Sequence, residues 1–301
     1  MKTAVLPSLA ALALAAALIP GSVAQARPRP ARPGDYDGDG RRDIAVTLER
    51  ARTHKSAILV YSGGARKVSR RPAVIRRPKT TGHFTALATG DFDGDGYADL
   101  AALLEREPVP GDVQGGLVVY SGSRKGLGRT ARTLLSWGAA GNAAPVAADL
   151  TGDGRADLVA ARPTGPDGGH LDVRLGTGRD FGLPLAPIPF KGSFTVGDVT
   201  GDGRADVVVA SGSRTLRVIR GTRAGLDTGH VKTVKTSAFG AKAIDAQDMV
   251  VQNPVGGAAK ELLIPDSAAP NLWVVPVTRP KAAQRLPVPL SGLLGEGTAR
   301  P

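Results

Sequence analysis

The segment Asp91-Phe-Asp93-Gly-Asp95-Gly-Tyr97-Ala-Asp99 decides the fold, because it occurs four times along the chain in closely related form. The other three copies are Asp35-Tyr-Asp37-Gly-Asp39-Gly-Arg41-Arg-Asp43, Asp149-Leu-Thr151-Gly-Asp153-Gly-Arg155-Ala-Asp157 and Asp198-Val-Thr200-Gly-Asp202-Gly-Arg204-Ala-Asp206. We number the residues of each loop as positions 1 to 9. Oxygen-bearing side chains occupy positions 1, 3, 5 and 9, and glycines at positions 4 and 6 permit the positive φ of a sharp turn.

This pattern predicts one calcium ion in each loop. Carboxylate and hydroxyl oxygens, together with the backbone carbonyl of position 7, form an oxygen-only ligand set that favours calcium over zinc or copper. The predicted ligands are Asp35, Asp37, Asp39, Arg41 and Asp43; Asp91, Asp93, Asp95, Tyr97 and Asp99; Asp149, Thr151, Asp153, Arg155 and Asp157; and Asp198, Thr200, Asp202, Arg204 and Asp206.

The alternative interpretation is four ordinary Asp-Gly turns between strands. The first two loops hold four acidic residues each and the last two hold three each, together 14 of the 27 in the chain. Carboxylates packed this closely repel one another unless a cation lies between them. The concentration of charge therefore favours calcium.

The residues after the loops distinguish between calcium-binding folds. An EF-hand needs Glu at position 12 and a helix on each side, whereas position 12 here is Val46, Ala102, Ala160 or Val209. The short apolar runs 43–48, 99–104, 157–161 and 206–210 begin at the ninth position and are typical of buried strands. Each loop is therefore expected to lead into a strand.

The loops are regularly spaced, starting at residues 35, 91, 149 and 198. Spacings of 56, 58 and 49 residues match a propeller blade of about four strands. A second repeated element, Leu117–Leu127, is echoed by Leu216–Leu226 and more weakly by 58–63 and 173–183. Each repeat thus predicts strand A, a calcium loop, strand B, strand C ending in a Gly-rich turn, and strand D.

With these residues in view, the chain resembles the FG-GAP/VCBS repeat family, whose members share the calcium-binding β-propeller of integrin α-subunit heads. The resemblance rests on the four loops, on the Ala-Asp-Leu/Val steps at Asp99, Asp157 and Asp206, and on the stretch Tyr120–Leu127. It implies an all-β propeller of four-stranded blades, with calcium loops between strands A and B of four blades. Integrin heads have seven blades, but repeats of this length in a 275-residue mature chain predict five.

The ends of the chain suggest export and a single domain. Lys2, the apolar run 4–19 and Ala24-Gln-Ala26 predict a secretory signal peptide over residues 1–26 and a secreted propeller domain over residues 27–301. The run is short for a membrane anchor, so no transmembrane segment is expected. The chain has no cysteine, so bound calcium is expected to stabilise it where disulfides cannot.

A fifth, degenerate repeat is predicted near residue 245. Residues 243–245 stand where strand A should be, 260–264 resemble strand B and 271–277 resemble strand C, but the intervening loop lacks the ligand spacing. We expect no metal there. The proline-rich segment 27–33 cannot serve as strand A of the first blade, so 289–296 is expected to supply it and close the ring. Each ion is expected at its own blade's turn, away from the blade interfaces, and therefore to be structural.

The net charge predicts anionic partners. The formal charge of +12 becomes +11 without Lys2 and about +19 with four calcium ions, which attracts teichoic acids, acidic polysaccharide, anionic lipid headgroups or extracellular DNA. Nucleic acid is disfavoured because no aromatic residues interleave with the cations. A basic cluster is predicted on strand D of the first blade and the crossing after it, and its alternative is a solvated outer edge. This cluster comprises Arg66, Lys67, Arg70, Arg71, Arg76, Arg77 and Lys79.

Three functions follow. We expect a secreted, monomeric binding or adhesion module for an extracellular or cell-envelope ligand, and not an enzyme, because the four histidines are scattered and no nucleophile or metalloprotease motif is present. The second possibility is a lectin, although sugar sites usually stack on Trp or Tyr and the chain has two Trp and four Tyr. The third is a hydrolase or lyase that uses calcium at its active site.

Overall fold

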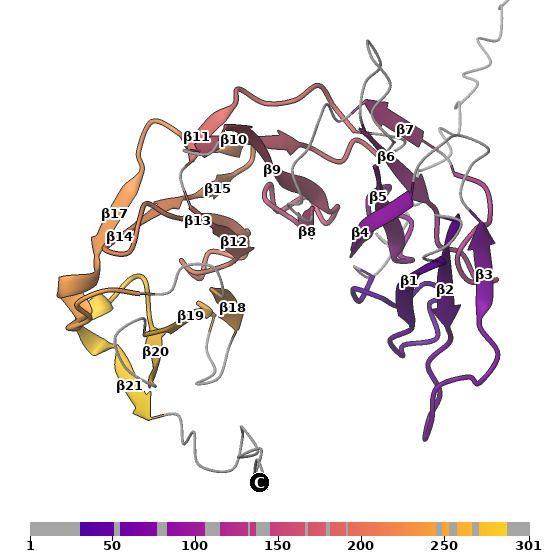
Figure 1. Cartoon of the computed structure of the whole chain (residues 1–301), viewed down its shortest axis with the longest axis horizontal. Helices are drawn as coiled ribbons and strands as arrows, with labels where there is room; N and C mark the ends of the chain where they lie inside the picture. The colour runs from indigo at the N-terminus through magenta and orange to yellow at the C-terminus, as the bar shows by residue number, and fades with distance from the viewer. Residues whose placement is uncertain are drawn as a thin grey trace, which may run out of the picture.

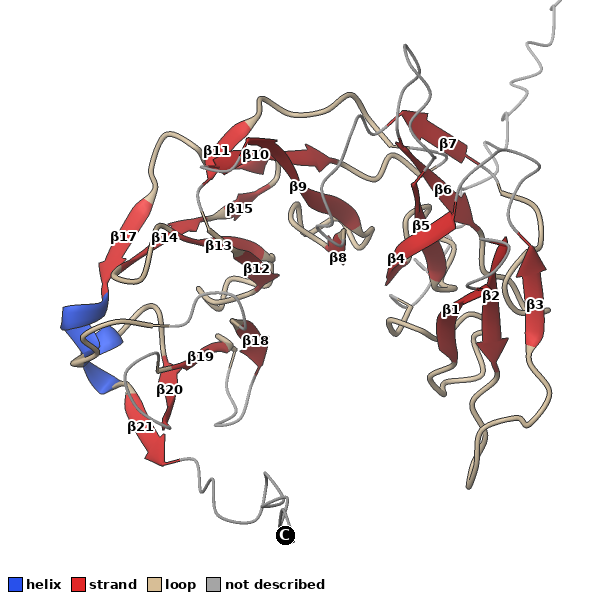
Figure 2. Cartoon of the chain, viewed as in Figure 1, coloured by secondary structure: helices blue, strands red, loops and turns tan. Residues whose placement is uncertain are grey.

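The computed structural model describes residues 31–50, 55–76, 83–105, 115–131, 133–136, 145–165, 168–178, 181–190, 192–244, 249–252, 258–266 and 271–287. The predicted signal peptide and the segment 289–296 lie outside these ranges. Within them the chain is all-β, apart from the short 3-10 helices η1 (Thr236–Phe239) and η2 (Pro280–Ala282) (Figure 2). No helix in these ranges is long and apolar enough to cross a membrane.

Five antiparallel sheets follow one another along the chain, and each is a simple meander. Sheet 1 is formed by β1 (Ile44–Arg50), β2 (Lys55–Tyr61) and β3 (Ala73–Arg76). Sheet 2 is formed by β4 (His83–Gly90), β5 (Asp99–Glu105), β6 (Gly115–Tyr120) and β7 (Thr133–Ser136). Sheet 3 is formed by β8 (Val146–Ala148), β9 (Asp157–Gly165), β10 (Gly168–Arg174) and β11 (Ile188–Phe190).

Sheet 4 is formed by β12 (Phe194–Gly197), β13 (Asp206–Ala210), β14 (Thr215–Ile219) and β17 (Lys232–Lys235). The small hairpin of β15 (Gly221–Thr222) and β16 (Gly225–Leu226) precedes β17. Sheet 5 is formed by β18 (Val250–Gln252), β19 (Glu261–Pro265), β20 (Asn271–Val275) and β21 (Gln284–Pro287). The strands predicted after the four loops are thus confirmed as β1, β5, β9 and β13.

The sheets are arranged along an open arc in chain order (Figure 1). The first strands β4, β8, β12 and β18 line its inner side, where each contacts the next, and the last strands lie outside. Sheets 1 and 5 occupy the two ends of the arc. The described residues therefore do not form the closed ring that we predicted. Sheet 1 has three strands, as expected from the prolines before it, and the segment expected to complete it lies outside the described ranges.

The fifth repeat differs from the prediction at its first strand. This strand is β18, whereas residues 243–245 had been expected to form it, and Ile244 makes only an isolated bridge with Asp266. The β-branched pair Val250-Val251 suits a strand better than Ala243-Ile-Asp245 and pairs with Leu263 and Leu262. The other two predicted strands are confirmed by β19 and β20.

Apolar side chains fill the spaces between successive sheets. Four apolar clusters of described residues each join two neighbouring sheets. Ile58 and Leu104 belong to the cluster between sheets 1 and 2, and Leu103 and Leu158 to the cluster between sheets 2 and 3. Val159 and Val207 belong to the cluster between sheets 3 and 4, and Val208 and Ile264 to the cluster between sheets 4 and 5. Sheets in the middle of the arc are covered on both faces, which explains why strands such as β13 are buried at every residue. The sheets therefore stack face to face, and the loops before their second strands are brought close together.

Candidate metal centres

The four acidic loops share one internal hydrogen-bond frame. The carboxylate of position 1 accepts from the amide of position 6, and the carboxylate of position 5 accepts from the amide of position 7. The first bond joins Gly40 N to Asp35 Oδ2 (3.0 Å), Gly96 N to Asp91 Oδ2 (3.0 Å), Gly154 N to Asp149 Oδ2 (2.8 Å) and Gly203 N to Asp198 Oδ2 (2.9 Å). The second joins Arg41 to Asp39 (2.8 Å), Tyr97 to Asp95 (2.9 Å), Arg155 to Asp153 (2.9 Å) and Arg204 to Asp202 (3.0 Å). Each turn therefore wraps around its own first carboxylate.

The carboxylate of position 9 connects the loop to the end of the second strand after it, which is β2, β6, β10 or β14 in the four repeats. One oxygen accepts from the amide of position 2, and the other accepts from a glycine that follows this strand of the same sheet. The glycine donors are Gly63 to Asp43 (2.8 Å), Gly122 to Asp99 (2.8 Å), Gly176 to Asp157 (2.9 Å) and Gly221 to Asp206 (3.0 Å). The two repeated sequence elements are thus bonded to each other, a connection that sequence reasoning missed.

Neighbouring loops are also bonded to one another across the sheets. The amide of position 8 donates to the carbonyl of position 1 in the preceding loop: Ala98 to Asp35 (3.0 Å), Ala156 to Asp91 (2.7 Å), Ala205 to Asp149 (2.8 Å) and Lys260 to Asp198 (2.7 Å). The loops therefore lie at the contacts between neighbouring sheets, whereas we had expected each ion at its own blade's turn, away from the blade interfaces. Because the sheets stack face to face, the residue just before each second strand reaches the preceding loop. Sheet 5 keeps this bond through Lys260 although its own loop lacks the ligand pattern.

The side chain of position 7 covers the preceding loop at its position-4 glycine. An added Cβ would lie 2.6 Å from the Tyr97 ring at Gly38, 3.2 Å from the Arg155 side chain at Gly94 and 3.2 Å from the Arg204 side chain at Gly152. Sequence reasoning assigned only a backbone carbonyl to position 7. The signal that could have revealed this packing was the glycine at position 4 of every loop.

Three of these position-7 residues are arginines that pair with the carboxylate of position 5. Nη1 lies 2.8 Å from Oδ2 in Arg41–Asp39, 2.7 Å in Arg155–Asp153 and 3.3 Å in Arg204–Asp202. In the second loop Tyr97 occupies this position and supplies no positive charge. The backbone amide of Arg41, followed by its side-chain hydrogen bond, holds the pKa of Asp39 below its ordinary value, whereas burial and the charges of Asp93 and Asp91 raise the pKa of Asp95.

The structure gathers carboxylate oxygens most closely in the first two loops. One oxygen from each of Asp35, Asp37 and Asp39 lies within 4.8 Å of the others, and the same holds for Asp91, Asp93 and Asp99. Among the described residues no such three-acid group forms in the two loops with threonine at position 3. The acidic side chains are thus clustered more closely in the first two loops than in the two loops with threonine at position 3.

The chemistry of these groups fits a divalent cation. Asp35 is 5% exposed, and its Oδ1 has no hydrogen-bond partner in the described part of the chain. Burial raises the pKa of Asp91, Asp43 and Asp206, and it raises the pKa of Asp157 to about 7, with smaller contributions from Asp149 and Asp153. Without a cation the loops hold negative charge at a cost, which bound metal would offset.

The predicted basic cluster is only partly on a strand. Arg66, Lys67, Arg70 and Arg71 are exposed in the loop between β2 and β3. Arg76 ends β3, its side chain is not described, and Arg77 and Lys79 lie outside the described ranges.

In the described part of the chain, His170 and His230 lie next to carboxylates. His170 lies 3.3 Å from Asp172 and His230 lies 3.1 Å from Asp227, each pair within one local segment. They are far apart in sequence and belong to separate ion pairs.

The fold and the site define an all-β protein built from repeated sheets that are joined through aspartate-rich loops. Residues 26–102 match the family model of the FG-GAP-like repeat, a range that contains the first two loops. A search of curated proteins found no match to this chain.

Two rhamnogalacturonan lyases are among the similar solved structures. The Bacillus licheniformis rhamnogalacturonan lyase PL11 aligns with a TM-score of 0.41 at 13% identity, over 73% of this chain and 55% of that chain. The rhamnogalacturonan lyase YesW aligns with a TM-score of 0.41 at 12% identity, over 73% of this chain and 49% of that chain. This chain thus spans about half the length of these enzymes.

Proposed function

We propose that this protein is an exported, calcium-binding repeat protein of the FG-GAP type that acts as a binding or adhesion module for a polyanionic ligand. In this proposal it is a β-propeller of five blades with calcium in four of them. The observation that carries it is the common frame of the four loops, which directs carboxylates inward and leaves the buried Asp35 Oδ1 without a partner.

The ions would be held by the side-chain oxygens of positions 1, 3, 5 and 9 and by the carbonyl of position 7. These are hard oxygen donors, which suit calcium. When bound, calcium would neutralise the clustered carboxylates. Hydrogen bonds from the backbone amides of each loop would orient its ligand side chains. The backbone hydrogen bonds between neighbouring loops would keep the loops aligned with one another.

The four sites would differ in affinity. The first two loops offer four carboxylates and the last two offer three, and calcium affinity follows ligand charge. In the first, third and fourth loops the arginine of position 7 pairs with the carboxylate of position 5 and so competes with calcium for that ligand. The second loop, with Tyr97 and four carboxylates, is therefore proposed as the tightest site.

Polyanion binding is supported by the charge of the chain. The formal net charge is +12, and four exposed cations lie on the loop between β2 and β3. Such a surface attracts anionic polymers of a cell envelope and loses this attraction as salt rises.

Calorimetric titration with calcium tests the metal sites, starting from full-length mature protein from which a chelator has removed bound metal. We expect about four equivalents, with the Asp95→Asn variant losing the tightest one and an Arg129→Gln variant retaining all. A stoichiometry of one or none would refute the proposal. A glycan array with a polyanion panel then tests the ligand, and turnover of any panel member would refute the non-catalytic role.

A further inference from the structure

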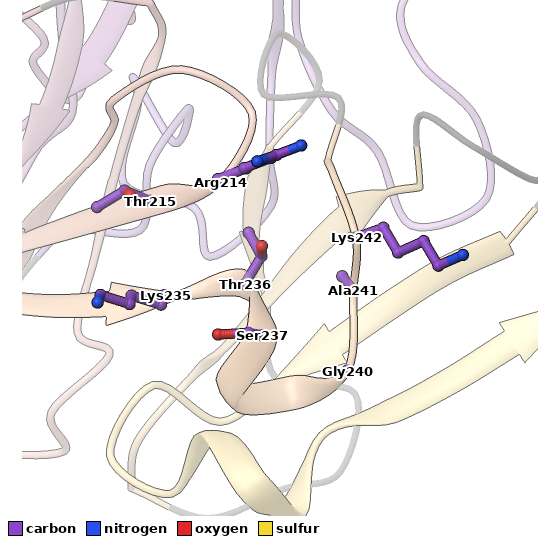
Figure 3. Close-up of a pocket in the computed structure, with 8 residues that line it drawn as sticks. All are labelled: Arg214, Thr215, Lys235, Thr236, Ser237, Gly240, Ala241 and Lys242. Atoms are coloured by element: carbon purple, nitrogen blue, oxygen red, sulfur yellow. The ribbon is translucent and has the colours of Figure 1, made fainter.

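A concave site lies at the end of sheet 4, far along the chain from the basic loop of sheet 1. Its volume is about 610 Å³ (Figure 3). The residues that line it come from the start of β14, the end of β17, η1 and the segment after η1. They are Arg214, Thr215, Lys235, Thr236, Ser237, Gly240, Ala241 and Lys242.

Backbone hydrogen bonds hold the rim of this pocket in place. Thr236 N donates to Arg214 O (3.0 Å), which joins the β14 side to the η1 side, and Ala241 N donates back to Thr236 O (3.1 Å). Gly240 turns the chain with φ of 85°. Below the rim, Phe239 packs edge-on against Trp273 at 5.6 Å between ring centroids. The lining residues are therefore positioned before any ligand arrives.

The pocket carries positive charge that the described residues do not neutralise. Arg214, Lys235 and Lys242 are exposed and have no ion pair within the described ranges, and no acidic residue is among those that line the pocket. Arg220, at the opposite end of β14, in contrast lies 3.1 Å from Asp202 Oδ2. The pocket therefore offers cations to an anionic ligand and places no carboxylate among its lining residues.

Hydroxyl groups accompany the cations on both sides of the η1 turn. In Figure 3 the Thr236 hydroxyl points to the Arg214 side, whereas the Ser237 hydroxyl points to the Lys235 side. The Lys242 and Lys235 amines extend in opposite directions. A single small anion would reach only part of this set, but an extended chain with repeated anionic groups and hydroxyls would reach both sides.

We propose that this pocket is a binding site for an acidic polysaccharide. Guanidinium and ammonium groups would bind its carboxylates or sulfates, and the exposed Ser237 would form hydrogen bonds with its hydroxyls, whereas Thr236 is buried in the wall of the pocket. No aromatic residue is among those that line the pocket, so it offers no surface on which a nucleobase would stack. This proposal rests on the proposed polyanion binding and locates it away from the basic loop.

Two variants of equal charge test the site. The first is Arg214→Gln with Lys242→Gln in the pocket, and the matched control is Arg124→Gln with Lys125→Gln, two exposed cations in the turn after β6. The full-length mature protein with calcium would be titrated with polygalacturonate, dextran sulfate and neutral dextran, and the melting temperature would confirm folding. We expect the pocket variant to bind the acidic polymers at least tenfold more weakly, the control less than twofold, and neutral dextran not to bind.

Each other outcome has a clear meaning. Equal losses in the two variants would overturn the pocket and leave general polyanion binding intact. If the unaltered protein bound neither acidic polymer, both the pocket and the proposed polyanion binding would be overturned. A preference for polygalacturonate over dextran sulfate would assign carboxylates as the ligand chemistry, and the reverse would assign sulfates. A Ser237→Ala variant, which keeps all charge, should weaken binding and separates hydroxyl recognition from charge alone; unchanged affinity would overturn the role of that hydroxyl.

Discussion

Gly176 offers a direct test of whether the loops join neighbouring sheets. It follows the third strand of sheet 3 and donates to Asp157. An alanine Cβ there would lie 2.5 Å from the carbonyl oxygen of Ala156 and 3.0 Å from that of Phe92, which belongs to the second loop. The added methyl would therefore push sheets 2 and 3 apart, although φ at this glycine is not positive and alanine itself is permitted.

The expected cost follows from this geometry. Overpacking by one methyl group against backbone typically costs about 1 to 3 kcal/mol, offset by about 0.4 to 1 kcal/mol because alanine restricts the unfolded chain. Gly229 is a matched control, since its Cβ would meet only Asp227 Oδ1 at 3.6 Å and its φ is also not positive. Gly229→Ala should be neutral or slightly stabilising, so we expect the two variants to differ by about 1 to 3 kcal/mol.

Urea denaturation in calcium would measure this difference, and hydrogen exchange would locate it. The amide of Ala156, which bonds to Asp91 O across the two sheets at 2.7 Å, should lose protection in Gly176→Ala but not in Gly229→Ala. If both variants were equally stable and Ala156 stayed protected, the argument that the loops join the sheets would be wrong.

Three further predictions concern the metal loops. If calcium at ~1 mM binds each site with Kd near ~0.1 mM, four sites contribute roughly 5 to 6 kcal/mol to the free energy of unfolding. Chelation should therefore lower the melting temperature by many degrees, and Asp95→Ala should reproduce part of this loss. An unchanged melting curve in EDTA would contradict this prediction. Because the pKa of Asp157 is raised to about 7, its protonated form favours folding, and the metal-free protein should lose up to about 4 kcal/mol as pH rises from 4 to 7. Urea melts in chelator should show a flatter pH dependence for Asp157→Asn; equal slopes would refute the assignment. Arg155→Gln should tighten calcium binding at the third loop several-fold, because it removes the cation that pairs with Asp153. Calorimetry would measure this change, with Arg129→Gln as the control that should leave the affinity unchanged. Equal calcium affinities in the two variants would contradict the prediction.

Local patterns explain what the sequence predicted well. The bonds that shape each loop, such as Gly96 N to Asp91 Oδ2, join residues at most eight positions apart, so the order of aspartates and glycines specifies the turn by itself. The apolar runs after the loops likewise specify buried strands, because covering both faces of a sheet removes any need for alternation. The all-β repeat of sheets was therefore predictable from residue order alone.

Contacts distant in sequence account for what was missed. The bond from Ala98 N to Asp35 O and the packing of Tyr97 on Gly38 each join residues about 60 positions apart, and they exist only because adjacent sheets stack face to face. The position of β18 depends on pairing with Leu262 and Leu263, which are more than ten residues away.

The sequence by itself determined the repeated sheets, the acidic turns and their clusters of oxygen-bearing side chains, because each depends on the chemistry of a few consecutive residues. The tertiary structure alone decided that the loops join one sheet to the next, that the sheets follow an open arc, and that Arg214, Lys235 and Lys242 share one pocket. These features depend on the relative placement of separately folded segments, which the burial of side chains between sheets sets and which no local pattern records.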